Sequence, residues 1–232
     1  PQPVAWVLNT LHPICLIETI DGRNDDTGNI LGLYQEDGLD EGIYITSEDV
    51  FIKIAREYHP FISTGDLNEM FACLKDCAPR KQKCKAKNLI AVNNGIFDFD
   101  TKQLRPFTPD LVFLSKSRVS YKVNVQNPVI HNNDDGTDWD VESWMADLSD
   151  DPEVVHLLWQ ILGAIIRPNV AWDKSAWLYS ECGNNGKGTL CELMRELCGK
   201  KSYAAIPLAD FGKDFYLTQL LNASAIIVDE ND

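Results

Sequence analysis

The feature that most constrains this 232-residue chain is the segment 176–190, in which an apolar run enters a loop of small residues and leaves it as a helix. The loop carries the string Gly-Lys-Gly-Thr at 186–189. Backbone N–H groups of a glycine-containing loop can converge on phosphate oxygens, and the positive end of the helix dipole points at the same place. The segment therefore predicts a P-loop, with helices packed on a parallel sheet.

The expected roles in this loop follow from the chemistry of its side chains. Lys187 is expected to reach the β- and γ-phosphates, and the Thr189 hydroxyl to hold Mg²⁺. The residues expected to contact the nucleotide are Gly183, Asn184, Asn185, Gly186, Lys187, Gly188 and Thr189. We therefore expect the cofactors to be ATP and Mg²⁺.

Two positions depart from the usual P-loop pattern. Glu181 stands where the first glycine belongs, and Gly188 stands where the hydroxyl belongs. A carboxylate close to a triphosphate weakens binding unless it points away. The second departure has a precedent, since Gly-Lys-Gly-Thr closes the phosphate loop of adenylate kinases.

A second signal follows at 224–230, where an apolar run ends in two adjacent carboxylates. Alone, such a run is a common strand end, but after a P-loop it is the Walker B pattern. Asp229 is expected to hold Mg²⁺ through water, and Glu230 to polarise the attacking water as a general base. Glu230 and Lys187 are the predicted catalytic residues.

Apolar periodicity and turn residues give the expected elements. Helices are predicted at 4–11, 50–58, 66–77, 139–148, 153–166, 187–197 and 214–221. Strands are predicted at 30–35, 42–46, 88–92, 96–99, 103–107, 175–180 and 224–228. The polar stretch 132–140 is expected to be a linker.

These elements predict an α/β chain in three parts. A mixed α+β domain, mostly helical with short strands, is expected at 1–135, and a helical connector at 136–170. A partial P-loop NTPase core with a parallel sheet is expected at 171–232. Trp144, Trp159, Trp172 and Trp177 are expected to pack in the core or between domains, and His156 to be a packed histidine.

Charge and cysteine content limit the partners. The net charge of −14 argues against a protein coated in nucleic acid. A basic stretch stands out, either as a solvated loop or as a local nucleic-acid patch: Lys75, Arg80, Lys81, Lys83, Lys85 and Lys87.

The seven cysteines are expected to be free thiols. Zinc at Cys73, Cys77 and Cys84 is the weaker hypothesis, because only His59 offers a fourth ligand. No apolar run is long enough to span a membrane.

The motifs together resemble a known family. Asn-Gly-Lys-Gly-Thr at 185–189, Leu-Cys-Gly at 197–199 and the Walker B run resemble superfamily three helicases of the AAA+ class. More narrowly, they resemble the primase–helicases of phages, plasmids and poxviruses. The segment 88–110, with its Asn-Asn-Gly turn, is similar to the domain that precedes the ATPase in those proteins. The resemblance extends over most of the chain from Ile30 onward.

This resemblance implies an activity and partners. Its members form rings, often hexamers, around DNA, hydrolyse ATP between subunits and move along one strand during DNA replication. Gly186, Lys187 and Thr189 would serve phosphate and Mg²⁺, and Asp229 with Glu230 would serve metal and water. The expected location is the cytoplasm of a bacterial host.

The ends of the chain suggest a fragment. It begins at Pro1, and it ends at Asp232, directly after the Walker B pattern. The family's sensor strand, arginine finger and pore loops would lie beyond that point, and no primase domain precedes it. We therefore expect the chain alone to bind nucleotide weakly and not to be a competent ATPase.

Two alternatives stay open. The first is a small nucleotide or metabolite kinase, which phosphate transfer to a small acceptor would reveal. The second is a non-catalytic module that binds DNA or partner subunits through residues 30–130 and carries a degenerate or truncated ATPase site. Nucleotide affinity separates this module from the helicase fragment.

Overall fold

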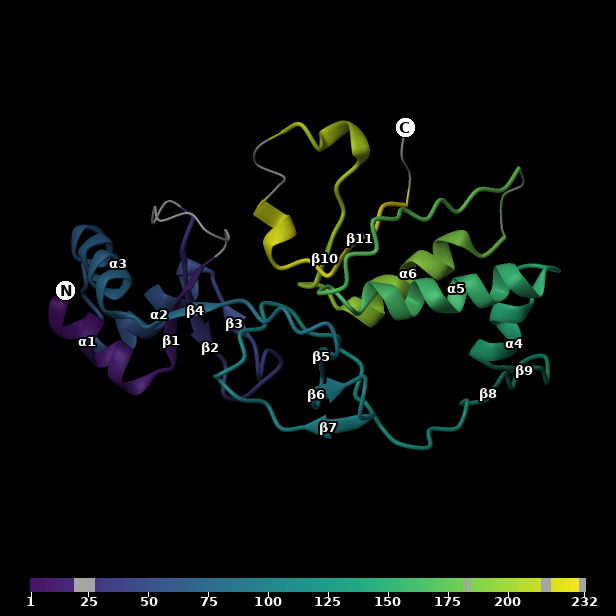
Figure 1. Ribbon diagram of the computed structural model, residues 1–232, viewed down its shortest axis with the longest axis horizontal. Helices are drawn as coiled ribbons and strands as arrows, with labels where there is room; N and C mark the ends of the chain where they lie inside the picture. Colours follow the sequence, from purple (N-terminus) through teal and green to yellow (C-terminus); the bar gives the residue numbers. More distant parts are fainter. Residues whose placement is uncertain (19–27, 182, 184, 214–217, 230–232) are drawn as a thin grey trace. The chain divides into compact units, whose positions relative to one another are not determined.

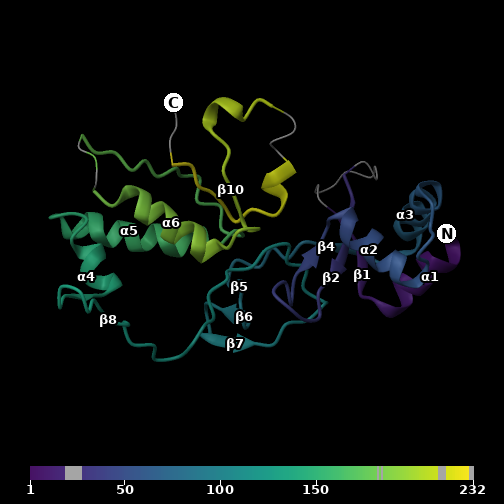
Figure 2. The same cartoon turned by 180° about the vertical axis from the view of Figure 1, so that it is seen from behind.

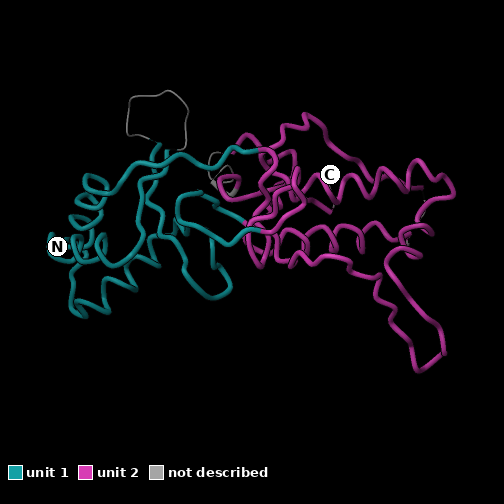
Figure 3. The backbone as a smooth tube through the Cα atoms, turned by 60° about the horizontal axis from the view of Figure 1, so that its bottom comes forward, with its two compact units in different colours: residues 1–86, 105–115 teal, residues 87–104, 116–232 magenta. Residues whose placement is uncertain are grey.

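The computed structural model describes all residues except 19–27, 182, 184, 214–217 and 230–232. The chain divides into two compact units, which Figure 3 distinguishes by colour. Unit 1 comprises residues 1–86 and 105–115, and unit 2 comprises residues 87–104 and 116–232.

Unit 1 is built on a four-stranded sheet with the order β3-β2-β1-β4. The strands are β1 (Ile14–Glu18), β2 (Ile30–Tyr34), β3 (Tyr44–Ile45) and β4 (Arg80–Gln82). β1 pairs antiparallel with β2 and parallel with β4. The first four residues of β1 are all buried, which explains why its sequence is a continuous apolar run and not an alternating one.

Three helices contribute more than half of the buried residues of the core cluster in unit 1. They are α1 (Gln2–Leu11), α2 (Glu48–Tyr58) and α3 (Thr64–Cys77), all labelled in Figure 1. Their apolar residues form one cluster with the side chains of β1 and β2. Ser63 caps α3 by accepting a hydrogen bond from the Asp66 N–H, which satisfies one otherwise unbonded donor.

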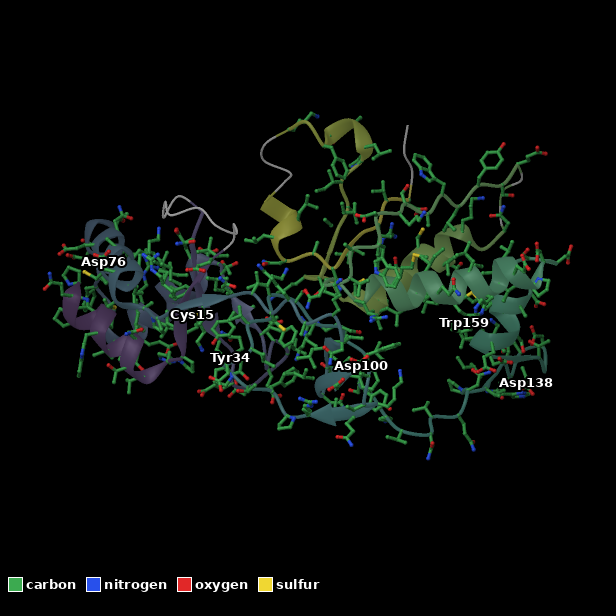
Figure 4. All side chains as sticks on the ribbon, viewed as in Figure 1. Cys15, Tyr34, Asp76, Asp100, Asp138 and Trp159 are labelled. Carbon is green, nitrogen blue, oxygen red and sulfur yellow. The ribbon has the colours of Figure 1, made fainter. Side chains whose placement is uncertain are left out.

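Residues 105–115 return to unit 1 and bond to Tyr44 and Lys81. The Tyr44 N–H donates to the Phe113 carbonyl, and the Tyr44 hydroxyl donates to the Pro109 carbonyl at 2.6 Å. Lys81 also donates to the Pro109 carbonyl, at 2.8 Å. Burial raises the pKa of the neighbouring Cys15 thiol to about 11, so this cysteine is a neutral packing residue. Figure 4 labels Cys15 and Tyr34 in this sheet.

Unit 2 begins with a small meander, β5-β6-β7. β5 (Leu89–Val92) and β6 (Gly95–Asp98) are joined by the two-residue turn Asn93-Asn94, and β7 (Gln103–Arg105) follows. β8 (Ile130–His131) and β9 (Asp138–Trp139) form a short antiparallel hairpin. β10 (Tyr203–Ala204) and β11 (Ala225–Ile226) pair in parallel.

The helices of unit 2 are α4 (Val141–Ala146), α5 (Pro152–Ile165) and α6 (Lys187–Cys198). Figure 2 shows α5 and α6 side by side from behind, as in Figure 1. Buried side chains from all three helices and from Ile227 form one cluster. This cluster fixes the axis of α6, the helix that follows the predicted P-loop.

The predicted mixed α/β class is confirmed, with six α-helices and several small sheets in the described residues. All predicted helices before residue 200 are present, with ends shifted by at most a few residues. The helix predicted at 214–221 begins outside the described residues, and a 3₁₀ helix occupies Thr218–Leu221. The division into domains at 135 and 170 stays a prediction.

Several predicted features are wrong. Residues 175–180 form no strand and pair with no described strand, and Trp177 and Tyr179 in this segment are 67% and 84% exposed. The expected linker at 132–140 contains β9 and the turn that joins it to β8, and the basic stretch contains β4. β1 was not predicted.

The described helices include none that is both apolar and long enough to cross a bilayer.

The predictions for single aromatic residues on α5 and after it also need correction. His156 is exposed and bonds to Gln160, so it is not a packed histidine. Trp159, Trp172 and Trp177 are substantially exposed, while Trp144 is half-buried against the core. For His156 and Trp159, the physical reason is that the fully buried residues of α5 are only Leu158 and Leu162, on another face of the helix.

The α3 core contact gives a direct test of the unit 1 fold. Leu74 is fully buried, so Leu74→Ala is expected to lower the free energy of unfolding by about 2–5 kcal/mol through lost burial and a residual cavity. Urea denaturation followed by circular dichroism measures this. Leu39→Ala is the control, because Leu39 is 81% exposed; equal effects of the two changes would contradict the core assignment.

Candidate nucleotide-binding site

The predicted P-loop ends where α6 begins. Lys187 is the first residue of α6, and Gly186 is its N-cap with a φ of 83°. Such a left-handed backbone is disfavoured for residues with a Cβ. Glycine has no side chain with which to cap the helix, so the first N–H groups of α6 depend on another acceptor. This is the arrangement in which helix N–H groups can bind phosphate oxygens.

Gly186 also lies tightly against α4 and the residues after it. A Cβ at this position would come within 2.5 Å of Leu148 Cδ2 and 3.8 Å of Trp144 Cζ2. By contrast, a Cβ at Gly183 or Gly188 would meet no described atom within 4 Å. Of these three glycines, only Gly186 therefore lies where a side chain would clash, and Gly183 and Gly188 face open space.

Lys187 is held by its own loop. Its Nζ donates to Asn185 Oδ1 at 2.7 Å, and both side chains are half-buried. In the part of the chain that is described, Lys187 has no carboxylate within 4 Å. A neutral amide does not compensate an ammonium charge, so this lysine keeps its attraction for an anion. Glu181, the residue that departs from the pattern, is exposed.

The C-terminal segment lies against α6 beyond its first turn. Ile227 packs in the same cluster as Leu190 and Met194. The Asp229 carboxylate is 3.9 Å from Arg195 Nη2, and Arg195 also pairs with Glu192 at 3.2 Å. Burial, followed by the charge of Asp229, raises the pKa of the Cys191 thiol.

Asp229 thus reaches the predicted P-loop helix, but its described contact is with Arg195. Arg195 lies two turns after Lys187, roughly 12 Å along the helix axis. The side chain of Asp229 is 54% exposed. For Asp229 to take part in holding a metal beside Thr189, it would have to exchange this salt bridge for the metal.

The residues predicted for the phosphate loop and the general base fall into three groups. Asn185 and Lys187 are brought together, and Gly186 forms the turn beside them. Gly188 and Thr189 occupy the exposed first turn of α6, and Gly183 is exposed before it. Asn184 and Glu230 lie outside the described residues, so their assigned roles stay predictions.

Sequence reasoning missed three residues that shape the site: Trp144, Leu148 and Arg195. Leu148 and Trp144 contact the glycine turn from a distant part of the chain, which no local pattern reveals. Arg195 could have been found, because it lies eight residues after Lys187 and so close to the same face of α6.

The donor groups fit a phosphate better than they fit a bare metal. Gly186 and Lys187 present N–H groups and an ammonium group without a carboxylate partner among the described residues. Within the same residues, no group of three His, Cys, Asp or Glu side chains could hold a metal ion, including the suggested zinc cysteines.

Comparison with known protein families identifies a match for part of this chain. A family model described as "D5 N terminal like" matches residues 27–150, more than half of the chain. No curated protein matches the chain. The matched range includes most of unit 1 and the β5-β6-β7 meander, and it ends before the predicted P-loop.

The two glycines that flank Lys187 allow a test of the loop geometry. Gly186→Ala is expected to lower the free energy of unfolding by about 1–3 kcal/mol, because of its positive φ and the contact with Leu148. At Gly188 an added Cβ would lie in open space on a helix. Gly188→Ala is therefore expected to raise the free energy of unfolding by up to about 1 kcal/mol. Urea denaturation of both variants measures this, and the opposite order would refute the left-handed turn.

The N-cap of α4 predicts a pH dependence. Hydrogen bonds from Ser143 lower the pKa of Asp140 from its ordinary value of 3.8 to about 2. The stabilisation from ionised Asp140 is therefore complete above the unfolded-state pKa and is lost as the pH falls through the folded-state pKa. The difference in urea midpoint between wild type and Asp140→Ala should be constant above pH 5 and shrink towards pH 2. A difference independent of pH would contradict this cap.

Proposed function

The chain belongs to the D5 N-terminal-like family, and from this membership we propose that it is part of an ATP-dependent replicative DNA helicase of the primase–helicase type from a phage or mobile element. In this proposal the chain binds ATP–Mg²⁺ through its P-loop. The family match supports a phage or viral primase–helicase-like protein. The nucleotide site is supported by the residues that follow the matched range.

The observation that carries the proposal is the pairing of Lys187 with Asn185 at the start of α6. The amide oxygen orients the ammonium group at 2.7 Å without neutralising it. The glycine N-cap leaves the first N–H groups of the helix to an outside acceptor. An anion with several oxygens, such as a triphosphate, satisfies both groups at once.

The other proposed roles follow the Walker patterns. Thr189 would hold Mg²⁺ with its hydroxyl, and Asp229 would hold it through water after leaving Arg195. Glu230 would accept a proton from the attacking water. A bound Mg²⁺ supplies charge that offsets the negative charge on the phosphate oxygens. The chain's own part is to bind and orient the phosphates with Gly186, Lys187 and the α6 N–H groups.

DNA and further copies of the protein are the proposed partners. A ring of subunits, often six in proteins that this chain resembles, would place the nucleotide between neighbouring copies. The cytoplasm of the host is the proposed location, since replication takes place there.

A second candidate function is favoured by the contact between Asp229 and Arg195. With its metal-binding carboxylate engaged by a cation, the chain would be a non-catalytic module that binds DNA or partner subunits. Glu181 in place of the first loop glycine favours the same candidate. The two functions differ in nucleotide affinity.

Equilibrium binding of a fluorescent ATP analogue in the presence of Mg²⁺ tests the proposal. Wild type is expected to bind saturably, and Lys187→Ala to bind at least about tenfold more weakly, because a charge-assisted contact to phosphate is lost. Asn185→Ala should weaken binding less, since it frees the ammonium group without removing it.

Lys200→Ala is the matched control, because Lys200 is an exposed lysine of the same unit. It is expected to bind like wild type. Binding that is absent in wild type, or equal in Lys187→Ala and Lys200→Ala, would reject a working phosphate loop and leave the non-catalytic module. Arg195→Ala frees Asp229, so tighter Mg²⁺-dependent binding in this variant would show that the salt bridge competes with the metal.

A further inference from the structure

A group of cations and aromatic rings gathers in unit 2 outside the phosphate loop. Lys102 Nζ lies 3.4 Å from the centre of the Phe99 ring, and Arg167 Cζ lies 4.1 Å from the same centre. The Arg167 guanidinium is also 5.8 Å from the centre of the Trp172 ring. We call these four residues the cation–aromatic patch.

The rings of this patch are open to solvent. Phe99 is 38% exposed and Trp172 is 45% exposed, although both are large apolar side chains. Proteins that bind single strands commonly stack bases on exposed aromatic rings. Arg167 lies within reach of both rings, so the two stacking surfaces belong to one site.

Among the described residues, the cations of the patch lack a carboxylate partner. Neither Lys102 nor Arg167 has a carboxylate within 4 Å among the described residues. Within those residues, Arg167 Nε is also buried without a hydrogen-bond partner, although its Nη2 donates to the Lys87 carbonyl at 3.2 Å. Two like charges at one ring repel each other, and an unsatisfied buried donor is destabilising. A phosphate from outside offsets the repulsion between the two cations.

The nearest acidic residues in sequence do not supply that acceptor. Asp98 is 2% exposed, and it accepts hydrogen bonds from Asn88 Nδ2 and from the N–H groups of Asp100 and Thr101. Asp100 and Asp173 are exposed but pair with neither cation. In a chain of net charge −14, an uncompensated pair of cations is a local feature that attracts phosphate.

We infer that the cation–aromatic patch is a binding surface for single-stranded nucleic acid. Lys102 and Arg167 contact backbone phosphates, and Phe99 and Trp172 stack against bases. Each nucleotide of a single strand carries one phosphate and one base whose face is exposed. The patch offers cations for the phosphates and rings for the bases. A duplex hides its base faces, and an acidic peptide makes no use of the rings. The inference rests on the proposed function only in choosing DNA as the first probe.

Fluorescence anisotropy of dye-labelled oligo(dT) of about 16 nucleotides, in nucleotide-free buffer, tests this surface. Trp172→Ala is expected to weaken binding about tenfold through lost stacking, and Trp172→Phe to restore most of it. Lys102→Gln is expected to lower the slope of log affinity against log salt by about 0.7, the value for one phosphate contact with a single strand. An oligo(U) probe distinguishes RNA from DNA, and binding of either supports the surface.

The controls lie in unit 1. Phe61→Ala removes a ring that is 93% exposed, and Lys53→Gln removes an exposed lysine, so both are expected to bind like wild type. Circular dichroism confirms that each variant is folded. No binding by wild type, or equal loss in patch and control variants, would overturn the inference.

Lys187→Ala separates this inference from the proposed function. It is expected to bind the oligonucleotide like wild type, because the phosphate loop is not part of the patch. Patch-dependent binding by a chain that fails to bind ATP would support the surface and reject the ATPase. ATP binding without patch-dependent oligonucleotide binding would support the nucleotide site and reject the surface.

Discussion

The candidate site depends on how α6 is held by its buried face. Leu190, Cys191, Met194 and Cys198 pack with α5 and with Ile227, and this contact fixes where the helix begins. Gly188 and Thr189 in the first turn of the same helix are exposed. The same packing holds the C-terminal segment against α6. The chemistry proposed for this chain is therefore a consequence of apolar burial on the opposite side of one helix.

Local signals predicted most of what local interactions determine. The Asn-Asn-Gly turn gave the β5–β6 hairpin, and the acidic start at Asp151-Pro152 gave α5, because turns and caps are set by neighbouring residues. The helix after Lys187 and its end at Gly199 followed from the same kind of evidence. For the site, the pairing of Lys187 with Asn185 lies within the motif itself.

The features that sequence could not predict depend on distant partners. β1 is a short apolar run whose strand character comes from pairing with β2 and β4. Residues 175–180 have strand-like composition but lack a ladder, so Trp177 and Tyr179 remain exposed. The contact of Gly186 with Leu148, the salt bridge of Asp229 with Arg195 and the cation–aromatic patch all join residues far apart or on different elements. No periodicity encodes such contacts.

The central claim is that the start of α6 binds the phosphates of a nucleotide. Hydrogen–deuterium exchange with and without ATP–Mg²⁺ tests it most directly, because it reports on the backbone N–H groups themselves. If these N–H groups bind phosphate, exchange in the segment 183–189 slows with ATP–Mg²⁺ and does not change with adenosine, which has no phosphate. Unchanged exchange in that segment at a saturating concentration of ATP–Mg²⁺ would contradict the account.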